Sequence, residues 1–360
     1  PPAGLADTLQ SVTLGARFDG TANGLNFLRL VLATAVIVGH SYVLTGSKLH
    51  QPFGRAIGDL PVDGFFAISG FLIAGAWLRR PDALAYFRAR IVRIFPGFLA
   101  CLVVTATVLA PLGIRLSGHQ PPDGYAASAF QFVVKNATLW MWQYDIAHTP
   151  DSVPRPGAWN GSLWTLFWEF LCYIGLAALG LTGWLQRSTV LIGSFAASSC
   201  LLVITSQGIL DGYPALGARF ATAFLGGVLV NHFKNRLPLR KWMVVAALLT
   251  ALAATVTDAS QVASPLLAYG LIGLGGFLKS AQFRFHTDVS YGVYIYAYPI
   301  QQILAGTGAR NLSILLFMLL SLLLTLPLAY ASWFCVEKPA LRLKGGVSRS
   351  GANRRQGSAS

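Results

Sequence analysis

The stretch LNFLRLVLATAVIVGHSYVL, residues 25–44, decides the fold class of this chain. About 20 apolar residues are long enough to cross the hydrocarbon core of a bilayer as a helix. Arg29 and His40 interrupt the stretch, and an arginine at bilayer depth costs about 2.5–3.5 kcal/mol on insertion scales. Their spacing is about three helical turns, so both lie on one helix face, about 16 Å apart. The stretch predicts a membrane helix whose polar face lines a functional site inside a bundle.

The composition extends this prediction to the whole chain of 360 residues. It is 54% hydrophobic and only 11% charged, whereas soluble domains carry about 25% charged residues. We therefore expect an all-α polytopic membrane protein of about ten transmembrane helices, with residues 25–340 as one membrane domain between a cytoplasmic segment (1–24) and a disordered basic tail (341–360). The apolar spans are expected at residues 25–45, 62–78, 91–113, 161–181, 189–207, 216–233, 242–257, 265–278, 289–306 and 312–336.

The basic charge follows the predicted membrane topology. A net charge of +14 is also found in proteins that bind nucleic acid, but most Lys and Arg residues here fall in alternate loops. That placement obeys the positive-inside rule if both termini are cytoplasmic. The charge therefore indicates a lipid bilayer as partner, and no nucleic acid.

His40 is expected near the outer end of the first span, and Asp63 opens the next span in VDGFFAISGFLIAGAWL (62–78). A short loop makes the two helices antiparallel neighbours, so Asp63 can approach His40. A carboxylate that orients an imidazole prepares a general base. The alternatives are that Asp63 caps its helix N-terminus and that His40 is a histidine satisfied within the bundle.

Basic residues mark the start of the third span in YFRARIVRIFPGF (86–98). Arg90 and Arg93 are three residues apart and lie side by side on a helix. A helix N-terminus with guanidinium groups attracts phosphate, so both residues, with Arg88, are candidates for binding a phosphorylated ligand. The alternative is a set of positive-inside anchors, which composition favours for Arg88.

Two further spans carry polar stripes. In GSLWTLFWEFLCY (161–173), one helix face holds Ser162, Thr165, Glu169 and Tyr173. An intramembrane glutamate is a functional candidate, and the alternative is a structural partner for an arginine such as Arg29 or Arg219.

In DVSYGVYIYAYPIQQIL (288–304), Tyr291, Tyr294, Tyr298 and Gln301 share a face. A stripe running through the span predicts a cavity wall, although tyrosines also form interfacial belts. The four cysteines lie in apolar spans without a ligand pattern, so no metal is expected.

In this order and spacing, the segments resemble the acyltransferase-3 family of membrane-bound, acyl-CoA-dependent O-acyltransferases over about residues 20–340. The resemblance rests on the Arg29–His40 spacing and on four segments. These are VDGFFAISGFLI (62–73), FRARIVRIFP (87–96), SLWTLFWEFLCY (162–173) and SYGVYIYAYPIQQ (290–302).

The resemblance implies ten transmembrane helices in a bacterial inner membrane, with acyl-CoA, acetyl-CoA above all, entering from the cytoplasm. It implies transfer of a short acyl group to a hydroxyl of a cell-surface or exported glycan or a lipid-linked sugar. The essential family histidine maps to His40, and the Arg-x-x-Arg pair maps to Arg90 and Arg93. Many members carry a histidine where this chain has Tyr298.

The sequence thus predicts catalytic roles for His40, as general base, and for Asp63 and Glu169. The predicted substrate-binding residues are Arg29, Ser162, Tyr173, Tyr291, Tyr294 and Tyr298. Two alternatives stay open: an acyltransferase for small molecules such as antibiotics, and a proton-coupled transporter, which also places ionisable groups within a bundle.

Overall fold

A computed structural model describes residues 12–20, 23–47, 53–209, 212–257, 259–278 and 287–343. Part of the predicted N-terminal segment (1–11 and 21–22) and most of the predicted tail (344–360) lie outside the described residues.

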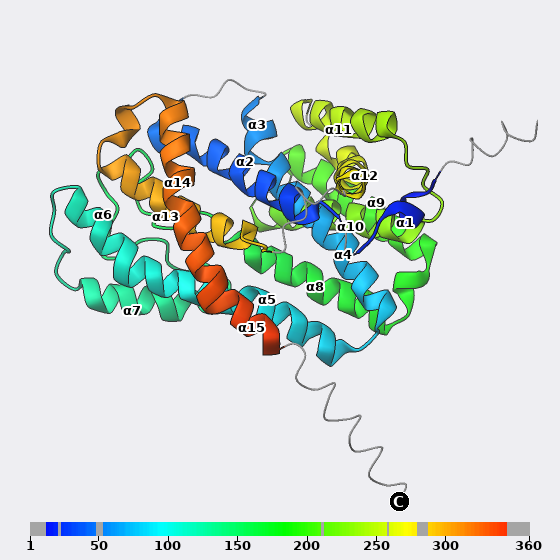
Figure 1. The fold of residues 1–360 in the computed structure, drawn as a ribbon, viewed down its shortest axis with the longest axis horizontal. Helices are drawn as coiled ribbons and strands as arrows, with labels where there is room; N and C mark the ends of the chain where they lie inside the picture. Colours follow the sequence, from blue (N-terminus) through cyan, green and yellow to red (C-terminus); the bar gives the residue numbers. More distant parts are fainter. Residues whose placement is uncertain are drawn as a thin grey trace, which may run out of the picture. The chain divides into compact units, whose positions relative to one another are not determined.

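In the described residues, every regular element is a helix (Figure 1). The α-helices are α1 (Leu14–Arg17), α2 (Leu25–Thr45), α3 (Phe53–Gly58), α4 (Leu60–Arg79), α5 (Ala83–Val104), α6 (Ala110–Leu116), α7 (Tyr125–Asn136), α8 (Thr165–Leu181), α9 (Ser188–Ser206), α10 (Tyr213–Phe233), α11 (Lys241–Val256), α12 (Ser260–Phe277), α13 (Ser290–Gly306), α14 (Ile314–Ser332) and α15 (Lys338–Arg342). Two π-helical turns, Thr105–Leu109 and Trp333–Glu337, join α5 to α6 and α14 to α15.

The ten expected spans overlap helices of the structure, and the third covers α5, the π-helical turn and α6 together. The fourth was predicted too long, because α8 begins at Thr165 and Ser162 lies in the turn before it. Six helical stretches of the described chain are long and apolar enough to cross a membrane: Leu25–Thr45, Leu60–Arg79, Ala83–Leu116, Ser188–Ser206, Tyr213–Phe233 and Ile314–Arg342. Thr165–Leu181, Lys241–Val256 and Ala263–Phe277 are shorter apolar helices. The prediction of an all-helical multi-pass membrane protein is confirmed.

The chain forms two compact units. The first comprises residues 1–35, 50–81 and 171–287, and the second comprises residues 36–49, 82–170 and 288–360. Two of the boundaries fall within helices, so α2 and α8 each contribute residues to both units.

In the first unit, α4 packs closely against α10. A Cβ atom at Gly70 would lie 2.0 Å from the Phe224 carbonyl oxygen, and one at Gly227 would lie 2.0 Å from that of Ala67. Small residues allow membrane helices to approach at backbone distance, so these two glycines set the crossing. Helices α9 and α12 also pack on α10, and α11 lies beside α12 (Figure 1).

In the second unit, α13 is the central helix. All its residues from Ser290 to Ala305 are buried, and α5, α6 and α14 pack against it. The polar side chains predicted for one face of α13 are therefore held inside protein, where they need partners.

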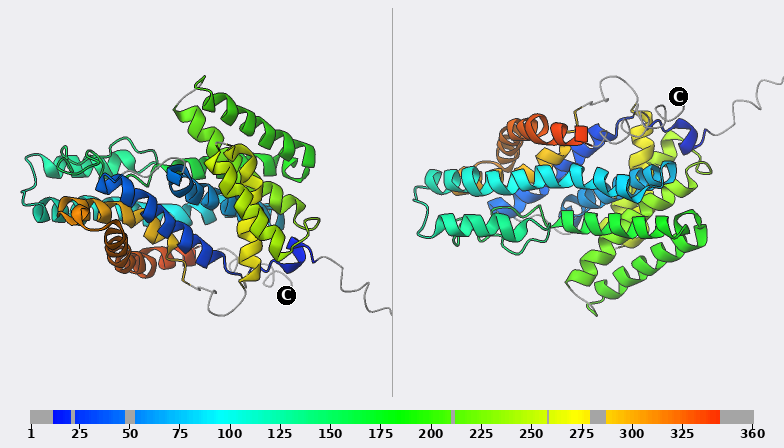
Figure 2. Two further views of the ribbon diagram at one scale, coloured as in Figure 1. Left: turned by 90° about the horizontal axis from the view of Figure 1, so that it is seen from above. Right: turned by 90° about the horizontal axis from the view of Figure 1, so that it is seen from below.

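The helix that runs from Ala83 to Leu116 is interrupted by the π-helical turn at Thr105–Leu109. Ala110 N donates to Thr105 O, five residues back. Pro111 has no N–H for the next carbonyl, that of Ala106. The Tyr125 hydroxyl of α7 donates to Ala106 O instead, at 2.7 Å, and α7 lies beside this turn and α5 (Figure 2). Burial raises the pKa of Tyr125, which keeps the hydroxyl protonated as a donor.

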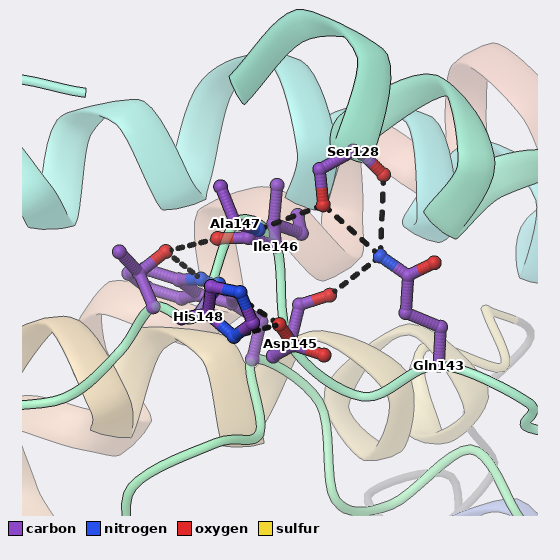
Figure 3. A network of polar contacts seen from close by, with 8 residues as sticks. Ser128, Gln143, Asp145, Ile146, Ala147 and His148 are labelled. Carbon is purple, nitrogen blue, oxygen red and sulfur yellow. Dashed lines mark hydrogen bonds and ion pairs between the residues drawn. The ribbon is translucent and has the colours of Figure 1, made fainter. Parts of the chain in front are cut away.

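Residues 137–164 contain little regular structure but are fastened by side chains. Figure 3 shows Ser128 of α7 accepting from the Gln143 side chain and, at 2.7 Å, from Ala147 N. Asn136 Oδ1 accepts from the backbone nitrogens of Trp142 and Gln143. This segment is therefore an ordered part of the second unit.

Candidate active site

His40 meets Tyr298 in the second unit. Their rings are edge-on, with centroids 5.0 Å apart. The His40 side chain is partly buried, and its Nδ1 is buried without a hydrogen-bond partner among the described residues. A Cβ atom at Gly161 would lie 2.6 Å from the Tyr298 ring, so this glycine makes the space that the tyrosine fills.

Gln301 joins the C-terminal half of α2 to α13. Its Nε2 donates to Ile37 O at 3.0 Å and to Ser41 Oγ at 2.9 Å. Ile37 and Ser41 flank His40 along α2. These bonds therefore fix the position of the histidine along the helix axis, and its rotation about that axis, relative to Tyr298. Gln301 was predicted on the polar face of α13, but its contact with α2 was not.

Within the second unit, the predicted polar stripe of α13 meets the first residues of the stripe predicted for 161–173. The Tyr294 hydroxyl is hydrogen-bonded to Thr165 Oγ1 at 2.5 Å and donates to Ser162 O at 3.1 Å. Asn160 anchors the turn before α8, because its Nδ2 donates to Ile295 O and its Oδ1 accepts from Ser162 N. The sequence analysis missed Asn160, which no periodic pattern marks.

Arg93 lies in a second polar cluster, with two acidic residues that the sequence analysis also missed. Its Nη2 is paired with Asp288, and its Nη1 lies 3.8 Å from Glu337 Oε2. Its guanidinium carbon lies 5.5 Å from the centroid of the Tyr291 ring, whose hydroxyl donates to Ile94 O. Glu337 is buried and also accepts from Ser332 Oγ. Arg93 is thus a partly buried cation with a defined orientation.

The other predicted arginines of α5 differ in their surroundings. Arg90 lies over the Tyr86 ring, with the guanidinium carbon 6.0 Å from the centroid. Arg88 Nη2 donates to Leu343 O. All three arginines occupy the first half of α5, as the sequence predicted.

In the first unit, Asp63 is the partner of Arg219. Arg219 Nε donates to Asp63 Oδ1 at 2.9 Å, and its Nη1 and Nη2 donate to Asp59 Oδ1 and Asp59 O. This arginine therefore has acidic partners at the start of α4. The prediction that Asp63 orients His40 joins residues of different units and stays a prediction.

The remaining predicted residues lie on helices as expected. Arg29 is partly buried on the part of α2 in the first unit, and Tyr173 of α8 is buried, with its ring centroid 6.2 Å from that of Phe224. Glu169 is partly buried in the second unit.

Comparisons with known proteins give the site its context. Residues 22–334 match the Acyl_transf_3 family, described as an acyltransferase domain. The chain is 28% identical over 332 residues to an O-acetyl transferase of Shigella phage Sf6, covering 88% of this chain and 95% of the relative. It is 26% identical over 357 residues to Nodulation protein 10 of Rhizobium leguminosarum bv. viciae, covering 91% of this chain and 95% of that relative.

No solved structure matches the chain. The family match extends over most of the sequence and includes every predicted site residue. This chain is therefore a membrane acyltransferase of the acyltransferase-3 family.

Proposed function

We propose that this protein transfers an acetyl or other short acyl group from cytoplasmic acyl-CoA to a hydroxyl of a cell-surface or exported glycan. His40 acts as the general base. The observation that carries the proposal is the environment of this imidazole, which Tyr298 holds edge-on at 5.0 Å. Its Nδ1 has no hydrogen-bond partner in the described part of the chain, which leaves that ring nitrogen for a substrate.

The reaction moves one proton in two transfers, through the imidazole. The imidazole takes the proton of the acceptor hydroxyl while the hydroxyl oxygen attacks the thioester carbonyl carbon. A carbon–oxygen bond forms, the carbon–sulfur bond breaks, and the proton passes to the sulfur of coenzyme A. The printed name of the phage relative, O-acetyl transferase, supports acetyl as the group and oxygen as its acceptor.

The donor is proposed to bind at the start of α5. Arg90 and Arg93, with Arg88 beside them, contact the phosphates of coenzyme A there. Asp288 and Glu337 hold Arg93 in position, and they also reduce its net attraction for an anion. Both carboxylates are therefore expected to weaken donor binding while they keep the guanidinium ordered.

The remaining site residues are assigned to the acceptor and the acyl group. Asp63 and Glu169 support catalysis, and the substrate-binding residues are Arg29, Ser162, Tyr173, Tyr291, Tyr294 and Tyr298.

The proposal includes a topology of ten transmembrane helices in a bacterial inner membrane, with both termini cytoplasmic. Residues 25–340 form the acyltransferase domain, preceded by a cytoplasmic segment (1–24) and followed by a basic tail (341–360). The six helices that are long enough to cross a membrane, the three shorter apolar helices and the placement of the basic residues support it.

The deciding experiment uses purified protein in detergent with radiolabelled acetyl-CoA and membrane glycan fractions. Label is expected in the glycan, with equimolar release of free coenzyme A, in the absence of any ion gradient. A His40→Ala preparation measures the background. A protein that consumes no acyl-CoA under these conditions and instead requires a membrane gradient would contradict the proposal and favour a transporter.

A further inference from the structure

A cavity of about 230 Å³ lies in the second unit, between α6, the end of α13 and two loop segments. Its lining includes Gly113, Ser117, Asp151, Trp159, Gln302 and Gly306. None of its polar residues was a predicted site residue.

The walls of the cavity are built by hydrogen bonds and by small residues. Trp159 is buried, and its Nε1 donates to Thr149 Oγ1 at 3.0 Å. A Cβ atom at Gly113 would lie 2.7 Å from the Trp159 ring, and one at Gly306 would lie 2.6 Å from Ser117 Oγ. The two glycines therefore set how closely α6 and α13 approach the side chains around the cavity.

The loop that forms one side of the cavity is held on both flanks. On one flank, His148 N donates to Asp145 Oδ2 and Ala147 N donates to Ser128 Oγ (Figure 3). On the other, Arg310 Nη1 donates to Ser152 O at 3.1 Å. This side of the cavity is formed before any ligand binds.

Gln302 is a buried polar residue of this cavity. Gln302 is 1% exposed. Its Nε2 donates to the carbonyl oxygens of Arg155 and Ala158, both at 2.8 Å. Its Oε1 is buried without a partner among the described residues. A buried acceptor left in this state costs about 1–3 kcal/mol, so a donor from a ligand would stabilise it.

Asp151 supplies a negative charge at the same cavity. Both Asp151 and Ser152 are exposed, and Ser152 Oγ donates to Asp151 Oδ1 at 2.9 Å. This hydrogen bond holds the pKa of Asp151 below its usual value, so the carboxylate is ionised near neutral pH. An ionised carboxylate accepts hydrogen bonds strongly and repels an anionic ligand.

The cavity residue Gln302 lies about one helical turn from Tyr298, the residue that contacts His40. Gln302 follows Tyr298 by four residues on α13, which is about 6 Å along the helix axis. Tyr298 in turn contacts His40. The cavity therefore lies close to the aromatic side chain that contacts the imidazole.

We propose that this cavity is the acceptor subsite and binds one neutral sugar ring, whose hydroxyls donate to Asp151 and Gln302 Oε1. The inference rests on the proposed function, because it names where that acceptor is held. The volume of about 230 Å³ suits a single ring. An acidic sugar binds more weakly, because its carboxylate would face that of Asp151.

The test measures how two methyl glycosides inhibit acetyl transfer from acetyl-CoA to glycan fractions by the purified full-length protein. The probes are a neutral methyl hexoside and the matching methyl hexuronide, which differ only in the carboxylate. The wild type should be inhibited competitively with the glycan by the neutral probe, at concentrations at least about tenfold below those of the hexuronide.

Asp151→Asn is the main variant, because the residue is exposed and the change is small. It should weaken inhibition by the neutral probe about tenfold, the scale of a lost hydrogen bond to a charged group. It should also bring the two probes close together in potency, which damage to the fold would not do. The KM for acetyl-CoA should stay unchanged. Asp123→Asn, an exposed aspartate outside the cavity, is the matched control.

Gln302→Met tests the buried acceptor independently, with a melting curve to confirm the fold. It should raise the KM for the glycan with an unchanged KM for acetyl-CoA. If Asp151→Asn behaves like Asp123→Asn, or the neutral probe fails to inhibit at about 100 mM, the subsite is wrong while the proposed function stands. If the wild type transfers no acetyl group from acetyl-CoA, the proposed function itself fails.

Discussion

The ring of His40 meets the ring of Tyr298 edge-on, at a centroid distance of 5.0 Å. An edge-to-face aromatic contact sets the plane of the smaller ring without a hydrogen bond between the two. Gln301 adds a second constraint by bonding to α2 on both sides of the histidine. The imidazole is therefore oriented by packing and by backbone contacts.

The first prediction concerns His40 as general base. His40→Ala should lower kcat at least about 100-fold, because loss of a general base costs about 10²–10⁴-fold. The dissociation constant for acetyl-CoA and the melting temperature in detergent should stay near wild type. His148→Ala is the control, since that side chain is fully exposed in a loop. Retention of more than a tenth of wild-type kcat would remove His40 from the mechanism.

Tyr298 is predicted to act through its ring. Tyr298→Phe keeps the contact with His40 and should retain kcat within about threefold, whereas Tyr298→Ala should lose at least about tenfold, because a misplaced catalytic group is costly. Initial rates at saturating donor and acceptor measure both. If Tyr298→Phe is as impaired as Tyr298→Ala, the hydroxyl takes part in the reaction.

The third prediction separates donor binding from stability at the start of α5. Arg90→Gln and Arg93→Gln should each weaken acyl-CoA binding by about 1.5–3 kcal/mol, the scale of a lost charged hydrogen bond. Arg93→Gln should also lower the melting temperature, because it leaves Asp288 and Glu337 without their cation. Isothermal titration and melting curves give the two quantities.

The matched control for this prediction is Asp288→Asn. It removes a negative charge beside Arg93 and should strengthen acyl-CoA binding. Unchanged donor affinity in both arginine variants would make these residues membrane anchors.

The fourth prediction concerns the pairing of Arg219 with the start of α4. Asp63→Asn should destabilise the protein by about 2 kcal/mol. Breaking a fully buried ion pair costs about 3–5 kcal/mol, and the cost is lower here because the Arg219 side chain is 21% exposed. Asp59→Asn should cost less, since Asp59 is 44% exposed. Unfolding curves in detergent measure which of the two variants loses more stability. A loss of kcat in Asp63→Asn without a change in stability would instead support a catalytic role.

The fifth prediction tests the crossing of α4 and α10. Gly70→Ala would place a Cβ atom 2.0 Å from the Phe224 carbonyl oxygen, and overpacking of this kind costs about 1–3 kcal/mol or more. Gly175→Ala of α8 is the control, because nothing lies within 4 Å of its added Cβ. Melting temperatures should fall for the first variant and hold or rise for the second. Equal melting temperatures for the two variants would show that the helix crossing adjusts without a loss of stability.

The helices could be predicted because their signal is local. A run such as residues 25–44 carries its own apolar length, and α2 covers it from Leu25 to Thr45. The tyrosine stripe of α13 was predictable for the same reason, since its spacing of three and four residues places the side chains on one face. Tyr294 and Thr165, from two predicted stripes, do meet.

Partnerships between distant residues could not be predicted. Arg219 bonds to Asp63 across 156 positions of sequence, and the sequence offered several arginines and acids as possible pairs. Glu337 comes to Arg93 from the other end of the chain. Side chains bonded to nearby backbone atoms, as Asn136 is, order residues 137–164 without a repeating pattern. Periodicity therefore located the stripes, and only the fold located their partners.

The π-helical turn at Thr105–Leu109 constrains the number of residues in this membrane-spanning helix. It holds one residue more than a regular turn, and removing that residue would restore bonding four residues back. Everything beyond it would then rotate by about 100°, which would carry Gly113 away from the Trp159 ring that it now accommodates. A deletion here would leave the hydropathy of the span intact and still misalign its far end. Homologous chains should therefore conserve the spacing between Pro96 and Gly113 more strictly than the apolar residues between them.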